Sequence, residues 1–295
     1  MLLQLQSNLQ NWARLVARQK YSFVRRYAIE QVYRQALNQE GKKLFRSHPT
    51  ASYEASYDVC VSRSSSAYSP ESELLYEAEV LRVGEEVAKA YARELGKCKI
   101  LVNSSGILDI ILEECEIRHG LRHRILSLLS DSEENSWKKV KQTLIEEFRI
   151  NPKNVEKLGN LMRINGDIAL VQKEVDHIKG VQFKEELKRE LERFQELCQA
   201  TYDIQLHIHF GFVLEEFPLY YSGLIFKVVC MKNLQKPGST GSVQRRTSLG
   251  HRTKVSLTKI AFGGRYDNSV EHRWNANVFA CGVRVYVTQI VRMLM

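Results

Sequence analysis

The sequence lacks the marks of several protein classes. No apolar run approaches the roughly 18 residues that a membrane-spanning helix needs, and residues 1–7 do not join a basic head to an apolar stretch, as a secretory signal does. The six cysteines are widely spaced, and none forms a CxxC pair or a Cys/His cluster with zinc-site spacing. We therefore expect reduced thiols, no metal site and a cytoplasmic location.

The sequence also contains no Walker loop, no glycine-rich loop of the protein-kinase type and no HRD catalytic loop. Its composition is that of a soluble globular protein, with 44% hydrophobic and 26% charged residues. The net charge of +9 suits a polyanionic partner such as RNA, because basic side chains neutralise phosphates and release counterions. A basic protein without a nucleic-acid partner can have the same composition.

Hydrophobic periodicity predicts a set of strands and helices. The strand patterns cover residues 24–34, 53–61, 99–103, 204–212, 224–231, 255–262 and 277–286. The helical patterns cover residues 70–95, 106–115 and 176–198, and residues 8–20 are expected to pass from extended to helical. The clearest boundary is a helix start at Ser69, a capping residue followed by Pro70, and Gly96 marks the expected end of that helix.

Residues 115–175 read as entirely helical and charged, which predicts a helical insertion in a larger core. We expect residues 1–114 to form the first part of that core and residues 176–295 the second part. Separate runs of helices and strands, with antiparallel hairpins, indicate the α+β class. The expected fold is one mostly antiparallel sheet flanked by helices.

Two stretches in the second part carry the most specific motifs. They are LYYSGLIF at 219–226 and AFGGRYD at 261–267, both apolar runs broken by small residues. They resemble the "DYYTG" hairpin and the "GGRYD" strand of the histidyl-tRNA synthetase family. Residues 25–34, RRYAIEQVYR, are similar to the first strand of motif 2 in that family. The resemblance implies the core fold of class II aminoacyl-tRNA synthetases.

Within this family, the chain most resembles the synthetase-like regulatory domain of the general-control kinase. His48-Pro49 followed by Tyr57-Asp58-Val59 is similar to that domain's "HPKE…FDIV". This kinase phosphorylates the alpha subunit of translation initiation factor two during amino-acid starvation. The resemblance implies uncharged tRNA as a partner, a kinase domain linked in cis, and a homodimer in the intact protein. It implies no cofactor in this chain, ATP belonging to the parent kinase, and no membrane.

Departures from the family motifs predict that the chain is not catalytic. Amino-acid activation builds negative charge on the α-phosphate of ATP, so the reaction needs fixed cations there. Several positions that carry this chemistry in the family hold other residues. These degenerate positions are Ala36, Thr50, Glu216, Leu219, Arg284 and Val285.

The residues that remain predict a vestigial ligand pocket. Its expected members are Arg34, Glu54, Asp58, Tyr220, Tyr221, Gly263, Gly264, Arg265, Tyr266 and Asp267. The alternative is structural: the aromatic residues belong to the core, the glycines serve a β-bulge, and Asp267 caps a turn. From charge alone, the basic residues expected to contact tRNA phosphates are Arg25, Arg26, Arg46, Arg245, Arg246 and Arg252.

Three functions remain open from the sequence: a tRNA-sensing regulatory domain, a truncated or divergent histidyl-tRNA synthetase, and a structural dimerisation module. The resemblance also implies that the chain is a fragment. Motif 1 of the family would precede Met1, and Met295 would fall inside the motif 3 helix.

Overall fold

A computed structural model describes residues 8–34, 50–130, 137–178, 180–201, 204–211, 221–233, 255–274 and 277–295. The strands are β1 (Phe23–Arg34), β2 (Thr50–Ser62), β3 (Lys97–Ser104), β4 (Asn165–Gly166), β5 (Leu206–His209), β6 (Leu224–Asn233), β7 (Val255–Arg265) and β8 (Val278–Val285). The helices are α1 (Asn8–Gln19), α2 (Pro70–Ala90), α3 (Ala92–Leu95), α4 (Ser105–Glu114), α5 (His119–Ser130), α6 (Trp137–Glu146), α7 (Pro152–Leu161), α8 (Ile168–Asp176), α9 (Val181–Ala200), α10 (Asp267–Trp274) and α11 (Val287–Leu294).

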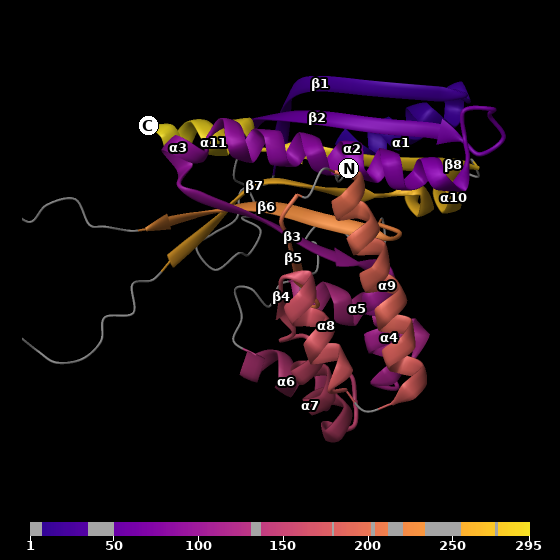
Figure 1. Cartoon of the computed structure of the whole chain (residues 1–295), viewed down its shortest axis with the longest axis vertical. Coiled ribbons are helices and arrows are strands. Elements are labelled where there is room, and N and C mark those ends of the chain that lie inside the picture. Colours follow the sequence, from indigo (N-terminus) through magenta and orange to yellow (C-terminus); the bar gives the residue numbers. More distant parts are fainter. Residues whose placement is uncertain are drawn as a thin grey trace, which may run out of the picture.

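The strands form one eight-stranded sheet in the order β1-β2-β8-β7-β6-β3-β5-β4 (Figure 1). Neighbouring strands are antiparallel except β3 and β5, which run parallel. The predicted class, a mostly antiparallel sheet flanked by helices, is therefore confirmed. β8 lies between β2 and β7, so the centre of the sheet joins segments from both ends of the sequence.

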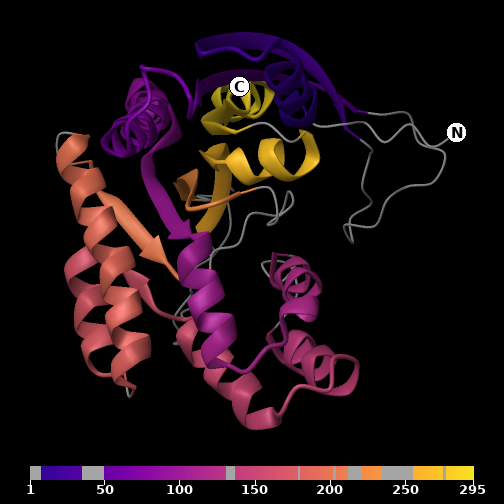
Figure 2. The same ribbon diagram turned by 90° about the vertical axis from the view of Figure 1, so that its right-hand side faces the viewer.

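Helices cover the two faces of the sheet. Arg25 pairs with Glu79 of α2, whereas the next residue, Arg26, stacks on Trp12 of α1. Successive side chains of a strand point to opposite faces, so α2 and α1 lie on opposite sides. Helix α10 contacts α1 and β8 on the α1 side. Helices α4 to α8 gather at the end of the molecule away from β1 (Figures 1 and 2).

The start of α2 shows why local sequence predicted it. Ser69 accepts a hydrogen bond from the backbone N–H of Ser72, and the Ser72 hydroxyl accepts one from the Ser69 N–H. This reciprocal cap satisfies amide groups that the first turn would leave unpaired. The helix expected over 70–95 is divided at Tyr91 into α2 and α3, and Gly96 ends α3 with a φ of 81°.

Three expectations from the sequence are corrected. The stretch 115–175 is not wholly helical, because Asn165–Gly166 forms β4 and pairs with β5. The helix expected from Asp176 begins only at Val181, after α8 has ended. Cys98 and Cys230 lie directly opposite each other on β3 and β6 and form a disulfide, so these two thiols are not reduced. Within the described ranges, every helix is too short or too polar to cross a lipid bilayer.

Candidate functional site

The expected ligand residues lie mainly on the α1 side of the sheet. In the strand register, Asp58 of β2 lies opposite Gly282 of β8. Arg284, two residues further along β8, lies between Ser56 of β2 and Phe262 of β7. Directly opposed residues of antiparallel strands point to the same face. Asp58 and Arg284 therefore share a surface, which we call the site face.

Asp58 is the most buried acid of the site face, at 1% exposure. The Tyr266 hydroxyl donates to Asp58 Oδ1 at 2.8 Å, and Trp12 Nε1 donates to the Tyr266 oxygen at 3.0 Å. Arg26 Nη1 lies 3.5 Å from Asp58 Oδ2. Burial raises the pKa of Asp58, although the charges of Arg284 and Arg26 and the Tyr266 hydrogen bond oppose that shift. Each oxygen of the carboxyl therefore has a partner within the protein.

Arg284 is buried in the same surface, with 5% of its area exposed. Among the described residues, its Nη2 atom has no hydrogen-bond partner, and a buried guanidinium nitrogen in that state is costly. The neighbouring Val285 points to the opposite face. The motif expected to lack its arginine therefore still places one cation on the site face, beside Asp58.

The glycines of the GGRYD stretch permit close contact between strands. Gly264 has a φ of 154°, and a Cβ atom there would lie 2.2 Å from the Leu224 carbonyl oxygen. A Cβ atom at Gly263 would lie 2.3 Å from the Gly282 carbonyl oxygen. Any side chain at either position would overlap the neighbouring backbone. The register shift between β6 and β7 falls between Val228 and Val229, whereas Gly263 and Gly264 pair regularly with Phe226 and Ile225. The glycines therefore permit close contact between strands and do not form the expected β-bulge.

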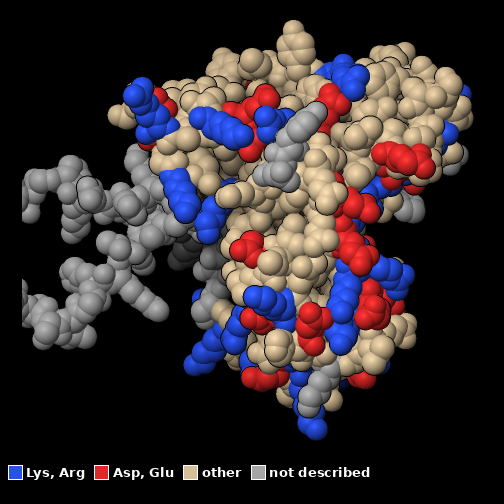
Figure 3. Space-filling model, in the orientation of Figure 1, with Lys and Arg blue, Asp and Glu red and all other residues tan. Residues whose placement is uncertain are grey.

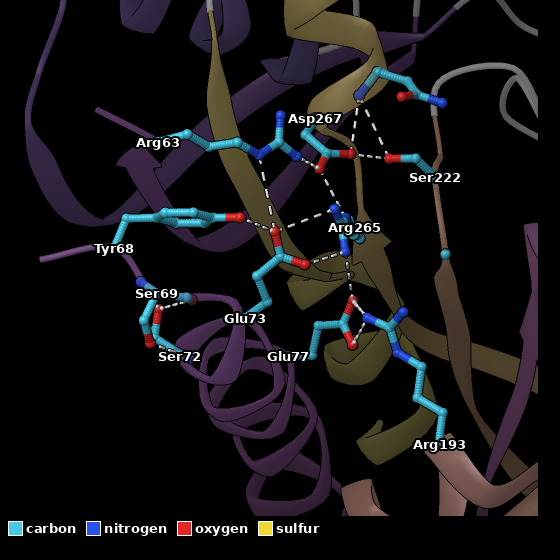
Figure 4. Close-up of polar contacts among 12 residues, drawn as sticks. Arg63, Tyr68, Ser69, Ser72, Glu73, Glu77, Arg193, Ser222, Arg265 and Asp267 are labelled. Carbon is cyan, nitrogen blue, oxygen red and sulfur yellow. Dashed lines mark hydrogen bonds and ion pairs between the residues drawn. The ribbon is translucent and has the colours of Figure 1, made fainter. Parts of the chain in front are cut away.

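Arg265 and Asp267 belong to a network of ion pairs (Figure 4). Arg265 Nε donates to Asp267 Oδ2 at 2.7 Å, and Arg265 Nη1 donates to Glu73 of α2 at 2.6 Å. Arg63, which follows β2, donates to the same Asp267 oxygen at 2.7 Å. The network ties the end of β7 to α2 and to the end of β2, which lie far apart in the sequence.

Two further groups extend this network, and sequence reasoning missed both. Arg193 of α9 donates to the two carboxylate oxygens of Glu77 at 3.1 and 3.0 Å, and Glu77 is fully buried. Burial raises the pKa of Glu77, whereas the nearby Arg193 and Arg265 lower it. The Ser222 hydroxyl donates to Asp267. The only sequence signals were the four-residue spacing of Glu73 and Glu77 on one helix face and the position of Ser222 within the YYSG stretch.

The opposite face of β1 and β2 carries an apolar groove of about 390 Å³. Its lining includes Tyr27 and Ile29 of β1 and Val291 and Leu294 of α11. Val285, a position where the family resemblance placed catalytic chemistry, lines this groove and not the site face. Aliphatic side chains there offer no group that could stabilise charge.

The structure describes some of the remaining expected site residues and not others. Glu54 and Tyr221 are buried, at 4% and 5% exposure. Arg34 and Thr50 are paired where β1 ends and β2 begins, and their side chains lie outside what the structure describes. The expected site and tRNA residues outside the described ranges are Ala36, Arg46, Glu216, Leu219, Tyr220, Arg245, Arg246 and Arg252.

The two described arginines expected to contact tRNA already have acidic partners. Arg25 donates to both carboxylate oxygens of Glu79, at 2.8 and 3.0 Å. Arg26 lies 2.7 Å from Glu30 and also contacts Asp58. Figure 3 shows basic and acidic side chains interspersed over the face it displays. On that face, the Lys and Arg side chains of the described residues do not form a single patch.

Solved structures of histidyl-tRNA synthetases are similar to this fold. A histidyl-tRNA synthetase from Nostoc sp. PCC 7120 superimposes with a TM-score of 0.65 at 18% identity, over 96% of this chain and 57% of that one. A structure from Bacillus halodurans, described as an ATP phosphoribosyltransferase regulatory subunit/histidyl-tRNA synthetase, gives 0.62 at 16% identity, over 96% and 62%. The fold is that of a class II aminoacyl-tRNA synthetase core.

Sequence similarity assigns the chain to one family within this class. The family model for histidyl-tRNA synthetase matches residues 70–243. The mitochondrial histidine–tRNA ligase of Saccharomyces cerevisiae is 26% identical over 262 residues, which are 88% of this chain and 45% of that protein. The histidine–tRNA ligase of Danio rerio is 23% identical over 264 residues, 88% of this chain and 47% of that protein. This chain belongs to the histidyl-tRNA synthetase family, and it spans about half the length of these relatives.

Proposed function

We propose that this chain is a histidyl-tRNA synthetase-like domain that has lost histidine activation and binds uncharged tRNA. In the intact protein it would regulate a linked kinase that phosphorylates the alpha subunit of translation initiation factor two during amino-acid starvation. Family membership supports the tRNA partner. The similarity of His48-Pro49 and residues 57–59 to the general-control kinase supports the regulatory role.

One observation supports the loss of catalysis: protein carboxylates already bind Arg26 on the site face and Arg63 and Arg265 in the ion-pair network beside α2. Arg26 contacts Asp58 and Glu30, while Arg63 and Arg265 share Asp267. A synthetase must direct such cations at the α-phosphate of ATP, where charge develops during the reaction. An arginine bound to a buried carboxylate supplies little net positive charge to a phosphate. Removing one such stabilising group costs about 100-fold or more in rate.

The tRNA partner is supported by the distribution of charge along the chain. Residues 234–254 contain five Lys or Arg residues and no Asp or Glu, within a chain of net charge +9. Binding through such residues displaces counterions, so affinity should fall steeply with added salt. We expect uncharged tRNA to bind through this electrostatic contribution.

The first test measures histidine-dependent exchange of pyrophosphate into ATP, with the full-length protein and a working histidyl-tRNA synthetase as the positive control. We expect no exchange above background. Binding of uncharged tRNA is then titrated at several salt concentrations, and kinase activity on the initiation factor is compared with and without that tRNA. Histidine-dependent exchange would overturn the catalytic part, and a binding constant indifferent to salt would overturn the electrostatic part.

A matched pair of variants locates the tRNA contact. Arg245→Ala combined with Arg246→Ala should reduce the salt slope by about 2, one for each lost phosphate contact. The control removes two basic residues from α2, Arg82 and Lys89, which are paired with Glu85. Equal effects from the two pairs would show that residues 234–254 have no special role.

A second candidate, a working histidyl-tRNA synthetase, is favoured by Arg284. Its buried Nη2 has no hydrogen-bond partner among the described residues and would be satisfied by a carboxylate or a phosphate oxygen. Calorimetric titration with histidine and with ATP tests this candidate. Binding that Arg284→Gln abolishes, together with pyrophosphate exchange, would establish the enzyme and exclude our first proposal.

A further inference from the structure

The pairing of β3 with β6 joins two parts of the molecule. On one side of this pair lie β1, β2, β8 and β7, and on the other lie β5 and β4. Helix α4 follows β3 directly, and helices α5 to α8 gather with it at the end of the molecule away from β1 (Figures 1 and 2). The β3–β6 pair therefore connects the strands next to these helices to the rest of the sheet.

One end of the β3–β6 pair is closed by hydrogen bonds. The Ser105 N–H donates to the Gly223 carbonyl oxygen at 2.8 Å, and the Gly223 N–H donates to Ser105 Oγ at 2.6 Å. The neighbouring Ser104 hydroxyl donates to Glu190 of α9 at 2.6 Å. These bonds hold the last residue of β3 and the start of α4 to the residue before β6 and to α9, without a covalent link.

The other end of the pair is closed by a disulfide. Cys98 and Cys230 form the second residue pair from that end of the ladder. The register of β6 with β7 shifts between Val228 and Val229, so the part of β6 that contains Cys230 pairs with β7 as a separate segment. The disulfide ties this last part of β6 to β3, across 132 residues of sequence.

The position of the two cysteines favours reversible chemistry. Their Cα atoms are 4.1 Å apart, close to the spacing of antiparallel pairs without hydrogen bonds, where side chains approach most closely. The backbone ladder therefore keeps the two thiols near each other after reduction. Cys98 is partly exposed and Cys230 is buried, so a dissolved thiol or disulfide reaches this pair at the Cys98 sulfur.

Three other cysteines are poorly placed for such chemistry. Cys60, Cys115 and Cys281 are all buried. Burial raises the pKa of Cys60 and of Cys115 to about 12, and it raises the pKa of Cys281 well above its usual value. Because the thiolate is the reactive form of cysteine, we expect these three thiols to react slowly with a dissolved oxidant.

We propose that Cys98 and Cys230 are a reversible oxidation site that controls how firmly one end of β3 is held to β6. The oxidant is a low-molecular-weight disulfide such as glutathione disulfide. The Cys98 thiolate attacks one sulfur of glutathione disulfide, whose S–S bond breaks and releases one glutathione thiolate. The Cys230 thiolate then attacks the Cys98 sulfur and displaces the second glutathione thiolate. The two released thiolates take up the two protons that the cysteines lost, and glutathione disulfide accepts the two electrons.

The two redox states differ in local stability. In the oxidised form, which the structure shows, the disulfide prevents the first residues of β3 from separating from β6. In the reduced form this end opens locally, whereas the hydrogen bonds between Ser105 and Gly223 keep the α4 end closed. Helix α3, which contacts β3, β6 and α11, lies at the end that opens.

Thiol trapping tests whether the oxidation is reversible. The full-length protein is equilibrated with mixtures of reduced and oxidised glutathione, its thiols are alkylated, and mass spectrometry measures alkylation at Cys98 and Cys230. We expect the two cysteines to lose and regain alkylation together as the glutathione ratio changes. A pair that stays bonded in excess reduced glutathione would be a permanent bridge and would overturn the proposal. A pair that stays unbonded in excess oxidised glutathione would overturn it equally.

Hydrogen exchange tests the local effect. Reduction should raise the exchange rates of amides in residues 97–99 and 229–231 by about tenfold or more, because the constraint that opposes local opening is removed. Exchange in residues 102–104, at the α4 end, should stay the same. Equal exchange in the two redox states would contradict a switch. A rise spread evenly over the whole sheet would show a general loss of stability and not a local one.

Two variants assign the effect to this pair. Cys98→Ala combined with Cys230→Ala should exchange like the reduced wild type in every glutathione mixture. Cys198→Ala in α9 is the matched control and should keep the wild-type response to glutathione. If the double variant does not fold, the oxidised and reduced wild-type proteins still give the decisive comparison. A double variant that still responds to glutathione would place the switch at another cysteine and overturn the proposal.

Discussion

The Tyr266 hydroxyl donates to Asp58 across 208 residues of sequence, and the pair is buried. Tyr266→Phe would leave Asp58 without this donor and Trp12 Nε1 without its acceptor. We expect the free energy of unfolding to fall by about 1–3 kcal/mol, the cost of an unsatisfied buried group. Urea denaturation measures it. Tyr53→Phe, at a half-exposed tyrosine on β2, is the control and should change stability by less than about 0.5 kcal/mol.

Gly264 should tolerate no side chain. Gly264→Ala would drive a Cβ atom into the Leu224 carbonyl oxygen, in a backbone conformation that alanine rarely adopts. We expect a loss of at least about 2 kcal/mol in the free energy of unfolding. Gly120→Ala in α5 is the matched control, since no atom lies within 4 Å of the added carbon. That change should be neutral or should stabilise by up to about 1 kcal/mol. Equal melting temperatures for the two variants would contradict the close contact.

The ion-pair network around Arg265 should be important for stability. Arg265→Ala leaves Asp267 with Arg63 as its remaining arginine partner and removes a direct partner of Glu73. Because Asp267 keeps Arg63 and the Ser222 hydroxyl as partners, we expect a loss of about 1.5–3 kcal/mol, the contribution of a hydrogen bond to a charged group. Arg82→Ala on α2 removes a more exposed pair with Glu85 and should cost about 1 kcal/mol or less. Thermal unfolding of both variants checks the contrast.

Tyr57 gives a pH-dependent prediction at the alkaline end. Burial, helped by its hydrogen bond to Glu79, raises the pKa of Tyr57 from 10.0 to about 12. The folded state therefore binds the phenolic proton more tightly than the unfolded state does. This contribution to stability is complete below pH 10 and is lost as the pH rises toward 12.

Tyr57→Phe cannot titrate, so it isolates that contribution. The difference in unfolding free energy between wild type and Tyr57→Phe should be constant below pH 10 and should then shift against the wild type as the pH rises further. Urea denaturation at a series of alkaline pH values measures the difference. A difference that stays constant through pH 12 would show that the phenol is not held in its protonated form.

Local signals predicted much of the fold because they act within a few residues. Ser69 and Pro70 specify the start of α2 by their own backbone chemistry, and the alternation in β1 reveals a strand directly. β4 escaped prediction because two residues, Asn165 and Gly166, are too short to show a period. The break at Tyr91 was missed because the apolar pattern continues through it.

Only the site residues that belong to sequence motifs could be predicted from the sequence. The GGRYD and YYSG stretches were visible because several specific residues lie together in the sequence. The long-range partners of those residues were not visible, since Arg265 and Glu73 lie 192 positions apart and no periodicity connects them. The Cys98–Cys230 pairing likewise depends on the register of two strands that meet only after folding.

The place of β8 in the sheet has a consequence for synthesis. The strand that joins β2 to β7 is made after both of them, so the nascent β1–β2 hairpin leaves the ribosome without its central neighbour. Until residues 278–285 emerge, the inner edge of β2 has no partner strand and is open to other chains. Sheets that depend on such distant pairings fold slowly. A growing chain of this kind would therefore be a natural client for chaperones that shield unpaired strands.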